Sequence, residues 1–259
     1  MRNHQFAIQT TDLATQVAEL TRLKFLPTNW EQLAPKALLG QLLLNSHPAA
    51  QSAPAGQQWL AGLAIDPATS AADWLASEQS LTTAAFHLLA LQLLGFEADV
   101  DYQVEAPSAA VAKINLPLPS PTKWTAKAVV TAFYALLVSR TKHGYRYLDQ
   151  LATQGALAWT YQLPATEKPL TFNGQPIACF DPARFIREVV YIETDLDTDF
   201  DGQADLVKAE IMRPAESDQG LAVPAVFTAS PYNQGTNDHW GQQLTHPVNH
   251  PLTHKEPAF

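Results

Sequence analysis

The chain has 259 residues, enough for one large domain or two ordinary ones, and its 46% hydrophobic content supplies apolar surface for a packed core. Sixteen Lys and Arg stand against 25 Asp and Glu, and the formal charge of -9 argues against nucleic acid and anionic membranes as partners, because both are bound through excess positive charge. The single cysteine, Cys179, excludes an intrachain disulfide scaffold.

The sequence predicts a cytoplasmic protein with no membrane partner. Its first ten residues contain one early Arg but no continuous apolar stretch, so no signal peptide is predicted. The apolar run over residues 84–94 is interrupted by His87 and Gln92 and is shorter than the ~20 residues that a membrane-spanning helix needs.

Helical periodicity dominates the chain from about residue 12 to residue 153. Capping residues and prolines set the expected helix ends. The first expected helices run from a cap at Asp12 to Leu23, from a cap at Asn29 to Leu44 between Pro27 and Pro48, over residues 57–63, and from Ser70 to Trp74.

A longer helix is expected over residues 81–94, after Ser80, with Gly95 as the left-handed residue that ends it. Residues 104–121 contain four prolines and are predicted to be a connector without a helix. Thr122 is expected to restart the helical pattern, which Gly144 ends, and residues 145–153 form a last short helix.

After about Gly155 the pattern changes to short runs rich in Val, Ile, Phe and Thr, which favour β-strands. We expect an antiparallel hairpin from the runs 187–194 and 205–213, which a polar turn containing glycine joins. The run 224–229 is apolar nearly throughout and is predicted to be a central strand covered on both faces. Two further short strands are expected over residues 170–172 and 177–180.

The candidate catalytic segment is Ala-Ser-Pro-Tyr-Asn-Gln-Gly over residues 229–235, directly after the predicted central strand. Loops at the carboxyl ends of such strands supply catalytic groups in α/β proteins, and a tetrahedral intermediate needs a preorganised hydrogen-bond donor for its oxyanion. Tyr232 can donate such a bond through its hydroxyl. The alternative is an ordinary turn with a packed tyrosine.

Two other groups of residues have the composition of metal sites. The acidic turn from Asp197 to Asp205 has the alternating carboxylates of a calcium loop, but Lys208 stands where the bidentate Glu of such a loop belongs, so a solvated turn is favoured. His246, His250 and His254 have helical spacing, but the prolines between them break a helix and favour a polar loop. Neither group is therefore predicted to be a metal site.

The order of features along the whole chain resembles the X-prolyl dipeptidyl aminopeptidases, bacterial serine peptidases related to cocaine esterase. No single stretch carries the resemblance; it rests on five landmarks in the right order. These are MRNHQF at residues 1–6, AFYALL at 132–137, REVVYIET at 187–194, DLVK with IMRP at 205–214, and TASPY at 228–232.

The resemblance implies an α + α/β fold: an all-helical domain over residues 1–155, followed over residues 156–259 by the first strands of an incomplete α/β-hydrolase catalytic domain. It implies a serine exopeptidase that releases N-terminal Xaa-Pro dipeptides, with Tyr232 in the oxyanion hole. Proline-containing peptides are the implied substrates. The implied enzyme needs no cofactor and is a homodimer with contacts through the helical domain.

The family's Ser-Asp-His triad is expected outside this sequence. None of the 11 glycines is followed two positions later by Ser, so a G-x-S-x-G nucleophile elbow is absent. The chain by itself is therefore expected to be inactive, and the remainder of the same polypeptide is its expected partner. Two alternatives stay open: an esterase or amino-acid-ester hydrolase of the same fold, and a non-catalytic helical interaction module.

Overall fold

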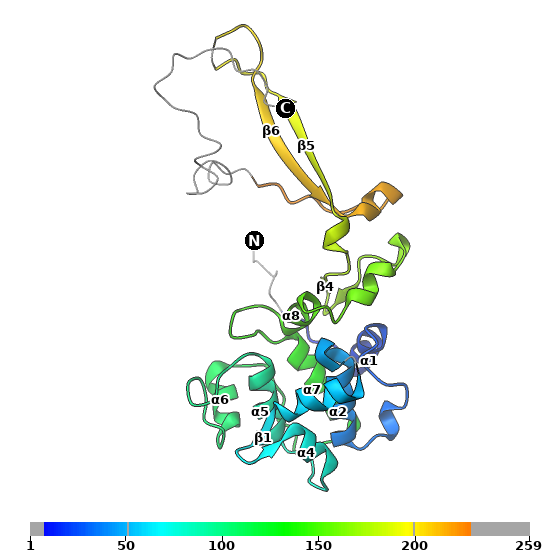
Figure 1. Ribbon diagram of the computed structural model, residues 1–259, viewed down its shortest axis with the longest axis vertical. Helices are drawn as coiled ribbons and strands as arrows, with labels where there is room; N and C mark the ends of the chain where they lie inside the picture. The colour runs from blue at the N-terminus through cyan, green and yellow to red at the C-terminus, as the bar shows by residue number, and fades with distance from the viewer. Residues whose placement is uncertain (1–7, 51, 199, 229–259) are drawn as a thin grey trace. The chain divides into compact units, whose positions relative to one another are not determined.

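The computed structural model describes residues 8–50, 52–198 and 200–228, and the chain divides into two compact units, Met1–Phe180 and Asp181–Phe259 (Figure 1). The first is a helical unit, which also contains residues beyond the last helix. Leu157, Leu170 and Phe172 are buried in its core. The structure thus groups residues 156–180 with the helices, and the predicted domain boundary at residue 155 stays a prediction.

Eight α-helices and two short hairpins make up the regular part of the described helical unit, with 3₁₀ turns between them. The helices are α1 Leu13–Arg22, α2 Pro35–Ser46, α3 Ala53–Ala61, α4 Ala71–Ala76, α5 Thr83–Leu93, α6 Pro107–Ile114, α7 Ala126–Val138 and α8 Tyr147–Thr153. The hairpins are the antiparallel pairs β1 Ala64–Asp66 with β2 Thr69–Ser70, and β3 Thr171–Phe172 with β4 Gln175–Pro176.

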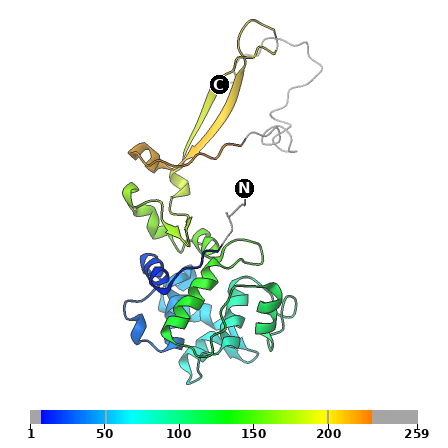
Figure 2. The same cartoon turned by 180° about the vertical axis from the view of Figure 1, so that it is seen from behind.

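The core of the helical unit is built around α5 and α7. Val129, Val130 and Phe133 of α7 have no exposed surface, because α1, α2 and α8 all contact this helix. Helix α5 packs against α6 and β1, and Figure 2 shows the same arrangement from behind. Both helices are apolar on nearly every side, as expected for helices that neighbours surround.

Several predicted helix ends are confirmed. The Asp12 carboxylate accepts a hydrogen bond from the backbone N–H of Thr15 at the start of α1, and Ser70 caps α4 through the N–H of Asp73. Gly95 has a φ of 80° after α5, and the N–H of Phe96 donates to the carbonyl of Leu91. A left-handed glycine with this bond is the usual way to end a helix, because glycine has no Cβ to clash.

Three predicted helix starts are wrong. The second helix begins at Pro35 and not after Asn29, which precedes only the 3₁₀ turn Trp30–Gln32. Proline disfavours helical backbone in the residue before it, so no helix can run through Ala34, whose ψ is 145°. Helix α5 is capped by Thr82 instead of Ser80. Helix α7 is capped by Thr125 instead of Thr122, because only the Thr125 hydroxyl accepts the N–H of Ala128.

Three further boundaries differ. Helix α7 ends at Val138, before Gly144, which was expected to end it. The third helix extends over Ala53–Ala61, where residues 57–63 were expected, and Ser52 caps it. The predicted connector over residues 104–121 contains α6, which begins at Pro107 and ends at the left-handed Asn115. A proline at the first helical position loses no hydrogen bond, so Pro107 can start a helix, and this helix ends before the next proline, Pro117.

The described part of the second unit, residues 181–198 and 200–228, contains one long hairpin between two 3₁₀ turns, Pro182–Arg184 and Ala215–Gln219. Strand β5, Ile186–Glu193, pairs with β6, Leu206–Arg213, in an unbroken antiparallel register from Ile186 opposite Arg213 to Glu193 opposite Leu206. The hairpin prediction is confirmed. Gly202, with a φ of 86°, supplies the left-handed residue that its polar turn needs.

Two strand predictions are wrong. The second strand of the small hairpin covers Gln175–Pro176 and does not extend over 177–180. Residues 224–228 form no strand, and Val226 and Phe227 are 92% and 87% exposed. An apolar run becomes a central strand only when strands pair with both its edges, and the described part of the chain offers only three two-stranded sheets.

Candidate functional site

The predicted oxyanion residue, Tyr232, lies outside the residues that the structure describes, as do residues 229–235 around it and the histidines from His239 to His254. The described residue nearest to Tyr232 in the sequence is Thr228, the first of the landmark TASPY. The role of Tyr232 therefore stays a prediction.

The acidic turn at the end of the β5–β6 hairpin uses its carboxylates to hold its own backbone. Asp197 accepts hydrogen bonds from the N–H groups of Asp201 and Gly202 at 3.2 and 3.0 Å, and Asp205 accepts one from Thr198 at 2.9 Å. Among the described residues, which exclude Asp199, no group of three or more His, Cys, Asp and Glu side chains is arranged to hold a metal ion. These contacts are those of a solvated hairpin turn.

His87 is a buried core histidine, as the sequence predicts. It lies in α5 with 2% of its surface exposed, and its Nδ1 is 2.9 Å from the Ser108 hydroxyl oxygen of α6. Burial lowers the pKa of His87, and the carbonyl of Pro119 acts in the opposite direction. The His87 ring therefore joins α5 to α6 through Ser108, and its Nε2 has no hydrogen-bond partner among the described residues.

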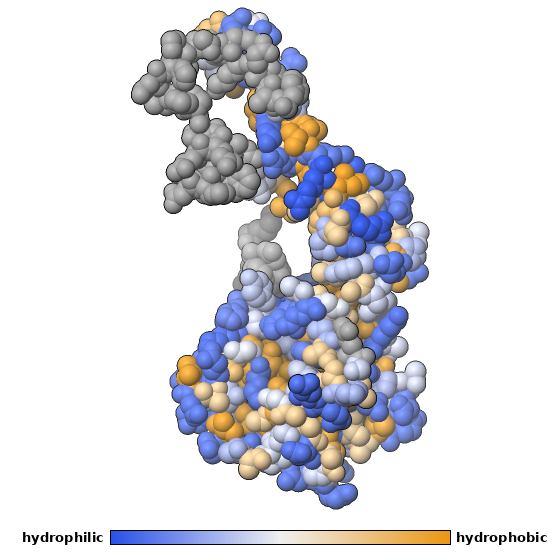
Figure 3. Space-filling model, viewed as in Figure 1, coloured by the Kyte–Doolittle hydropathy of each residue, from blue (hydrophilic) through white to orange (hydrophobic). Residues whose placement is uncertain are grey.

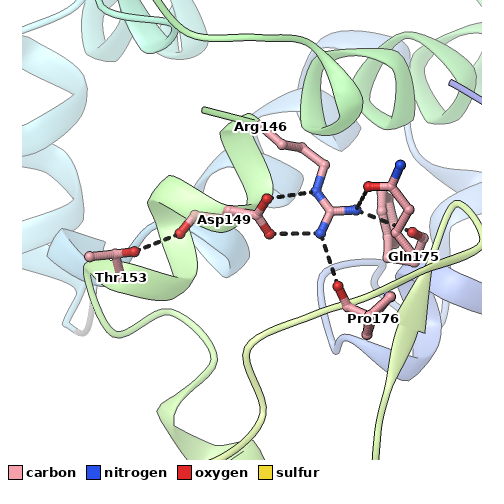
Figure 4. Close-up of polar contacts among 6 residues, drawn as sticks. Arg146, Asp149, Thr153, Gln175 and Pro176 are labelled. Atoms are coloured by element: carbon pink, nitrogen blue, oxygen red, sulfur yellow. Dashed lines mark hydrogen bonds and ion pairs between the residues drawn. The ribbon is translucent and has the colours of Figure 1, made fainter. Parts of the chain in front are cut away.

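The densest polar cluster of the helical unit surrounds Arg146, directly before α8 (Figure 4). Its guanidinium makes a bidentate ion pair with Asp149, with N···O distances of 2.7 and 3.1 Å. The same group donates to the carbonyls of Phe172 and Pro176 at 3.3 and 3.4 Å, and to the side-chain oxygen of Gln175 at 3.3 Å. One side chain thus joins α8 to both strands of the β3–β4 hairpin.

A cavity of about 500 Å³ lies beside this cluster. Arg140, Arg146 and Asp149 bring charges to its wall, and the largely exposed Tyr145 and Ile8 bring apolar surface. Arg140 donates to the carbonyl of Gly144 at 2.7 Å, which closes the loop before α8. The groups on this wall can orient a polar chain segment through hydrogen bonds, but they include no nucleophile and base pair.

A second polar cluster surrounds Asn173 in the turn of the β3–β4 hairpin. The Tyr134 hydroxyl of α7 donates to the Glu19 carboxylate of α1 at 2.5 Å, and the N–H of Asn173 donates to the same carboxylate oxygen at 3.0 Å. Burial, followed by the bond to Glu19, raises the pKa of Tyr134 to about 12. The side chain of Asn173 exchanges two hydrogen bonds of 2.8 Å with the backbone of Gln9.

Neither the Arg146 cluster nor the Asn173 cluster is predicted from the sequence. Arg146 and Asp149 have the i, i+3 spacing of a helical ion pair inside the predicted helix 145–153, and Asn173-Gly174 is a strong hairpin signal between two apolar runs. Those signals predict the local pair and the turn. They do not predict that Arg146 binds this hairpin or that Asn173 in its turn contacts Glu19 and Gln9, because these contacts join residues that are 26 to 164 positions apart.

The β5–β6 hairpin has one strongly apolar face that no other described residues cover. Residues opposite each other in register share a face, and Val190, Ile192, Val207, Ala209 and Ile211 lie together on one of them. Ile192 and Val207 are 52% and 53% exposed, and Figure 3 shows hydrophobic side chains at the surface of the hairpin. An ion pair of 2.8 Å between Arg213 and Glu188 ends this apolar face.

The family model for the N-terminal domain of the X-prolyl dipeptidyl aminopeptidase PepX matches residues 1–156. The chain belongs to the PepX family. The match covers the whole described set of eight helices and includes Arg146 and Asp149 of the first polar cluster.

Proteins named Xaa-Pro dipeptidyl-peptidase resemble this PepX-family chain over nearly its full length. The protein from Pediococcus pentosaceus is 48% identical over 257 residues, which are 98% of this chain and 31% of that protein. Those from Lactiplantibacillus plantarum and Ligilactobacillus salivarius are 41% and 40% identical over 258 residues, which are 99% of this chain and 32% of each protein. The chain thus spans about a third of the length of these relatives.

The match extends past the helical unit, through the β5–β6 hairpin and into the sequence around Tyr232. Within residues 8–50, 52–198 and 200–228, no helix is both long and apolar enough to cross a membrane.

Proposed function

We propose that this chain is the N-terminal part of a serine exopeptidase that releases Xaa-Pro dipeptides from the N-termini of peptides. The observation that carries the proposal is the 40–48% identity, over 98–99% of the chain, to proteins named Xaa-Pro dipeptidyl-peptidase. Membership in the PepX family supports the same reaction. The substrates on this proposal are proline-containing peptides, and the site of action is the cytoplasm.

We propose further that residues 181–259 begin a catalytic domain of the α/β-hydrolase fold. The apolar face of the β5–β6 hairpin supports this, because sheet residues of this kind are stable when other elements cover them. The exposed apolar side chains of Val226 and Phe227 support it too, because apolar surface of this kind is usually buried against further elements of a protein. On this proposal, later parts of the same polypeptide supply the covering strands and helices.

The proposed mechanism is acylation of a serine that lies beyond this chain, assisted by an Asp-His pair that also lies beyond it. The serine oxygen attacks the carbonyl carbon of the substrate proline while the histidine takes the serine proton. The carbonyl oxygen then carries a negative charge, and Tyr232 donates a hydrogen bond to it. Residues 1–259 alone are inactive on this proposal, because they hold the oxyanion donor without the nucleophile.

The decisive experiment for the oxyanion role is Tyr232→Phe in the full-length enzyme, assayed on an Ala-Pro anilide. We expect kcat to fall by on the order of 100-fold or more with little change in KM, as when other oxyanion donors are removed. Tyr161→Phe is the matched control, because Tyr161 lies in the 3₁₀ turn Ala158–Gln162, outside the cavity wall and both polar clusters, and keeps wild-type kcat on this proposal. An unchanged kcat for Tyr232→Phe rejects the role.

The same assay separates the two hydrolase activities that the sequence left open. A peptidase turns over the Ala-Pro anilide much faster than simple acyl esters or amino-acid esters, and an esterase shows the reverse order. We also propose that the intact enzyme is a homodimer with contacts through the helical unit, and its mass in solution tests this. An interaction module without activity would turn over neither substrate.

A further inference from the structure

The β3–β4 hairpin is held by side chains at nearly every residue. Arg22 of α1 donates to the carbonyl of Thr171 at 2.5 Å, and Arg146 donates to the carbonyls of Phe172 and Pro176. Asn173 meets Glu19, Tyr134 and Gln9. Helices α1 and α7, the residue before α8 and the segment before α1 thus all contact a hairpin that pairs only two residues with two.

The hairpin receives more side-chain hydrogen bonds than its small size leads us to expect. Two-residue strands with an Asn-Gly turn bury little surface on their own, and an isolated hairpin of this size is not stable in water. Its position in the chain explains the contacts: Cys179 is fully buried just after it, and the second compact unit begins at Asp181. The hairpin is therefore the last anchored element before the chain leaves the helical unit.

We propose that the β3–β4 hairpin fixes the point at which the chain leaves the helical unit, and that Arg146 is the positioning residue that holds it there for the peptidase reaction. The activity part of this inference rests on the proposed function; the anchoring part does not. Arg146 acts through the hairpin and touches no reacting atom.

The chemistry of arginine explains why this residue suits the task. Its planar guanidinium presents five donors in fixed directions, and Asp149 holds it in place through two of them while the others face the hairpin. The Arg146 side chain is 11% exposed, so water screens these bonds less than on an open surface. A lysine keeps the charge beside Asp149 but cannot reach Phe172, Gln175 and Pro176 together.

The anchor is tested by hydrogen exchange of full-length enzyme carrying Arg146→Ala or Arg146→Lys. Peptides that cover residues 170–180 report on it, because the N–H of Ile177 donates to the carbonyl of Leu170 across the hairpin. We expect exchange there to become about tenfold faster or more in both variants, as the loss of charged hydrogen bonds predicts. If Arg146→Ala does not fold, Arg146→Lys still gives the measurement.

The matched control is Lys142→Ala, which removes ion pairs of 2.8 and 2.9 Å to Glu97 and Asp101 elsewhere in the same unit. We expect this control to leave exchange over residues 170–180 at the wild-type rate. Unchanged exchange in both Arg146 variants overturns the anchor, because the bonds would then be dispensable. An equal increase of exchange over residues 170–180 in Lys142→Ala also overturns the anchor, because it would reflect a general loss of stability.

The activity arm uses the same proteins on an Ala-Pro anilide at a temperature where all remain folded. We expect the Arg146 variants to lose about tenfold in kcat/KM, since a displaced positioning element costs catalysis at a distance, while Lys142→Ala keeps the wild-type value. Faster exchange with wild-type kcat/KM overturns the positioning role. Failure of the proposed function looks different, because wild-type enzyme itself would then not turn over the substrate, and exchange would still decide whether the hairpin is anchored.

Discussion

The burial of His87 makes the free energy of unfolding depend on pH. Its folded pKa lies below the usual 6.5 because burial disfavours the charged ring. Below pH 6.5 the unfolded chain therefore binds a proton that the folded chain does not, and the free energy of unfolding decreases as the pH falls from 6.5 toward the folded pKa. Above pH 6.5 both states are neutral and this contribution is constant.

The test is His87→Asn, which can keep a hydrogen bond to Ser108 but does not titrate. We expect the midpoint of thermal unfolding of the wild type to fall more between pH 7.5 and pH 5.5 than that of the variant. His47 also has a pKa lowered by burial, so it leaves a residual pH dependence of the same sign in both proteins. An equal decrease for the two proteins would show that the His87 ring does not set this dependence.

Among the helices, the start of α7 offers a comparison between two nearby threonines. Thr125 accepts the N–H of Ala128 at 3.2 Å, whereas Thr122 precedes the helix without capping it. Thr125→Ala is expected to lower the free energy of unfolding by about 1 kcal/mol, because a helix donor loses its partner. Thr122→Ala is expected to change it by less than about 0.5 kcal/mol. Urea unfolding of the two variants measures both, and equal losses would contradict this assignment of the cap.

The same helices show what the sequence can predict and where it fails. Apolar periodicity predicts that α1, α5, α7 and α8 exist, because the apolar residues of each helix recur at helical spacing within its own stretch of sequence. Their ends depend on which of several nearby hydroxyls reaches a backbone N–H, and on whether a proline starts or ends a helix. In the structure Thr82 and Thr125 make the capping hydrogen bonds, and Ser80 and Thr122 do not. The residue types alone do not indicate which hydroxyl caps each helix.

Across the whole chain, the sequence predicts local elements better than the contacts between them. The β5–β6 hairpin was predictable from its two runs of strand-favouring residues and the polar turn between them. The structure of the run 224–228 was not, because an apolar run does not indicate which strands will flank it. The Arg146 and Asn173 clusters depend on distant residues in the same way. The position of Tyr232 after an apolar run makes it a candidate oxyanion donor, and the family resemblance then favours this role over that of a packed tyrosine in an ordinary turn.

The uncovered apolar face of the second unit gives a prediction for the chain by itself and for the intact protein. Val207 lies opposite Ile192 on that face, so Val207→Lys puts a charge on the apolar surface through which chains otherwise associate. We expect residues 1–259 with Val207→Lys to show a smaller aggregated fraction in size-exclusion chromatography than the wild-type chain. In the full-length protein we expect the same change to lower the yield of folded enzyme, because a buried lysine is costly there.

Gln203→Lys is the control for this comparison, since it adds the same charge at the exposed polar turn of the same hairpin. We expect it to leave the full-length yield at the wild-type level. If Val207→Lys is tolerated as well as Gln203→Lys in the intact protein, the apolar face is not covered there, and the proposed sheet does not include it on that side.

The difference between the two units bears on the order of events during synthesis. Every buried partner described for the helical core comes from residues up to 180, so a nascent chain of that length already contains what α5 and α7 pack against. The hairpin emerges next and finds no cover for Ile192 and Val207 within the described residues. Domains generally fold as units during synthesis, so we expect the helical unit to fold first. The nascent hairpin then needs later segments of the chain or a chaperone to cover its apolar face.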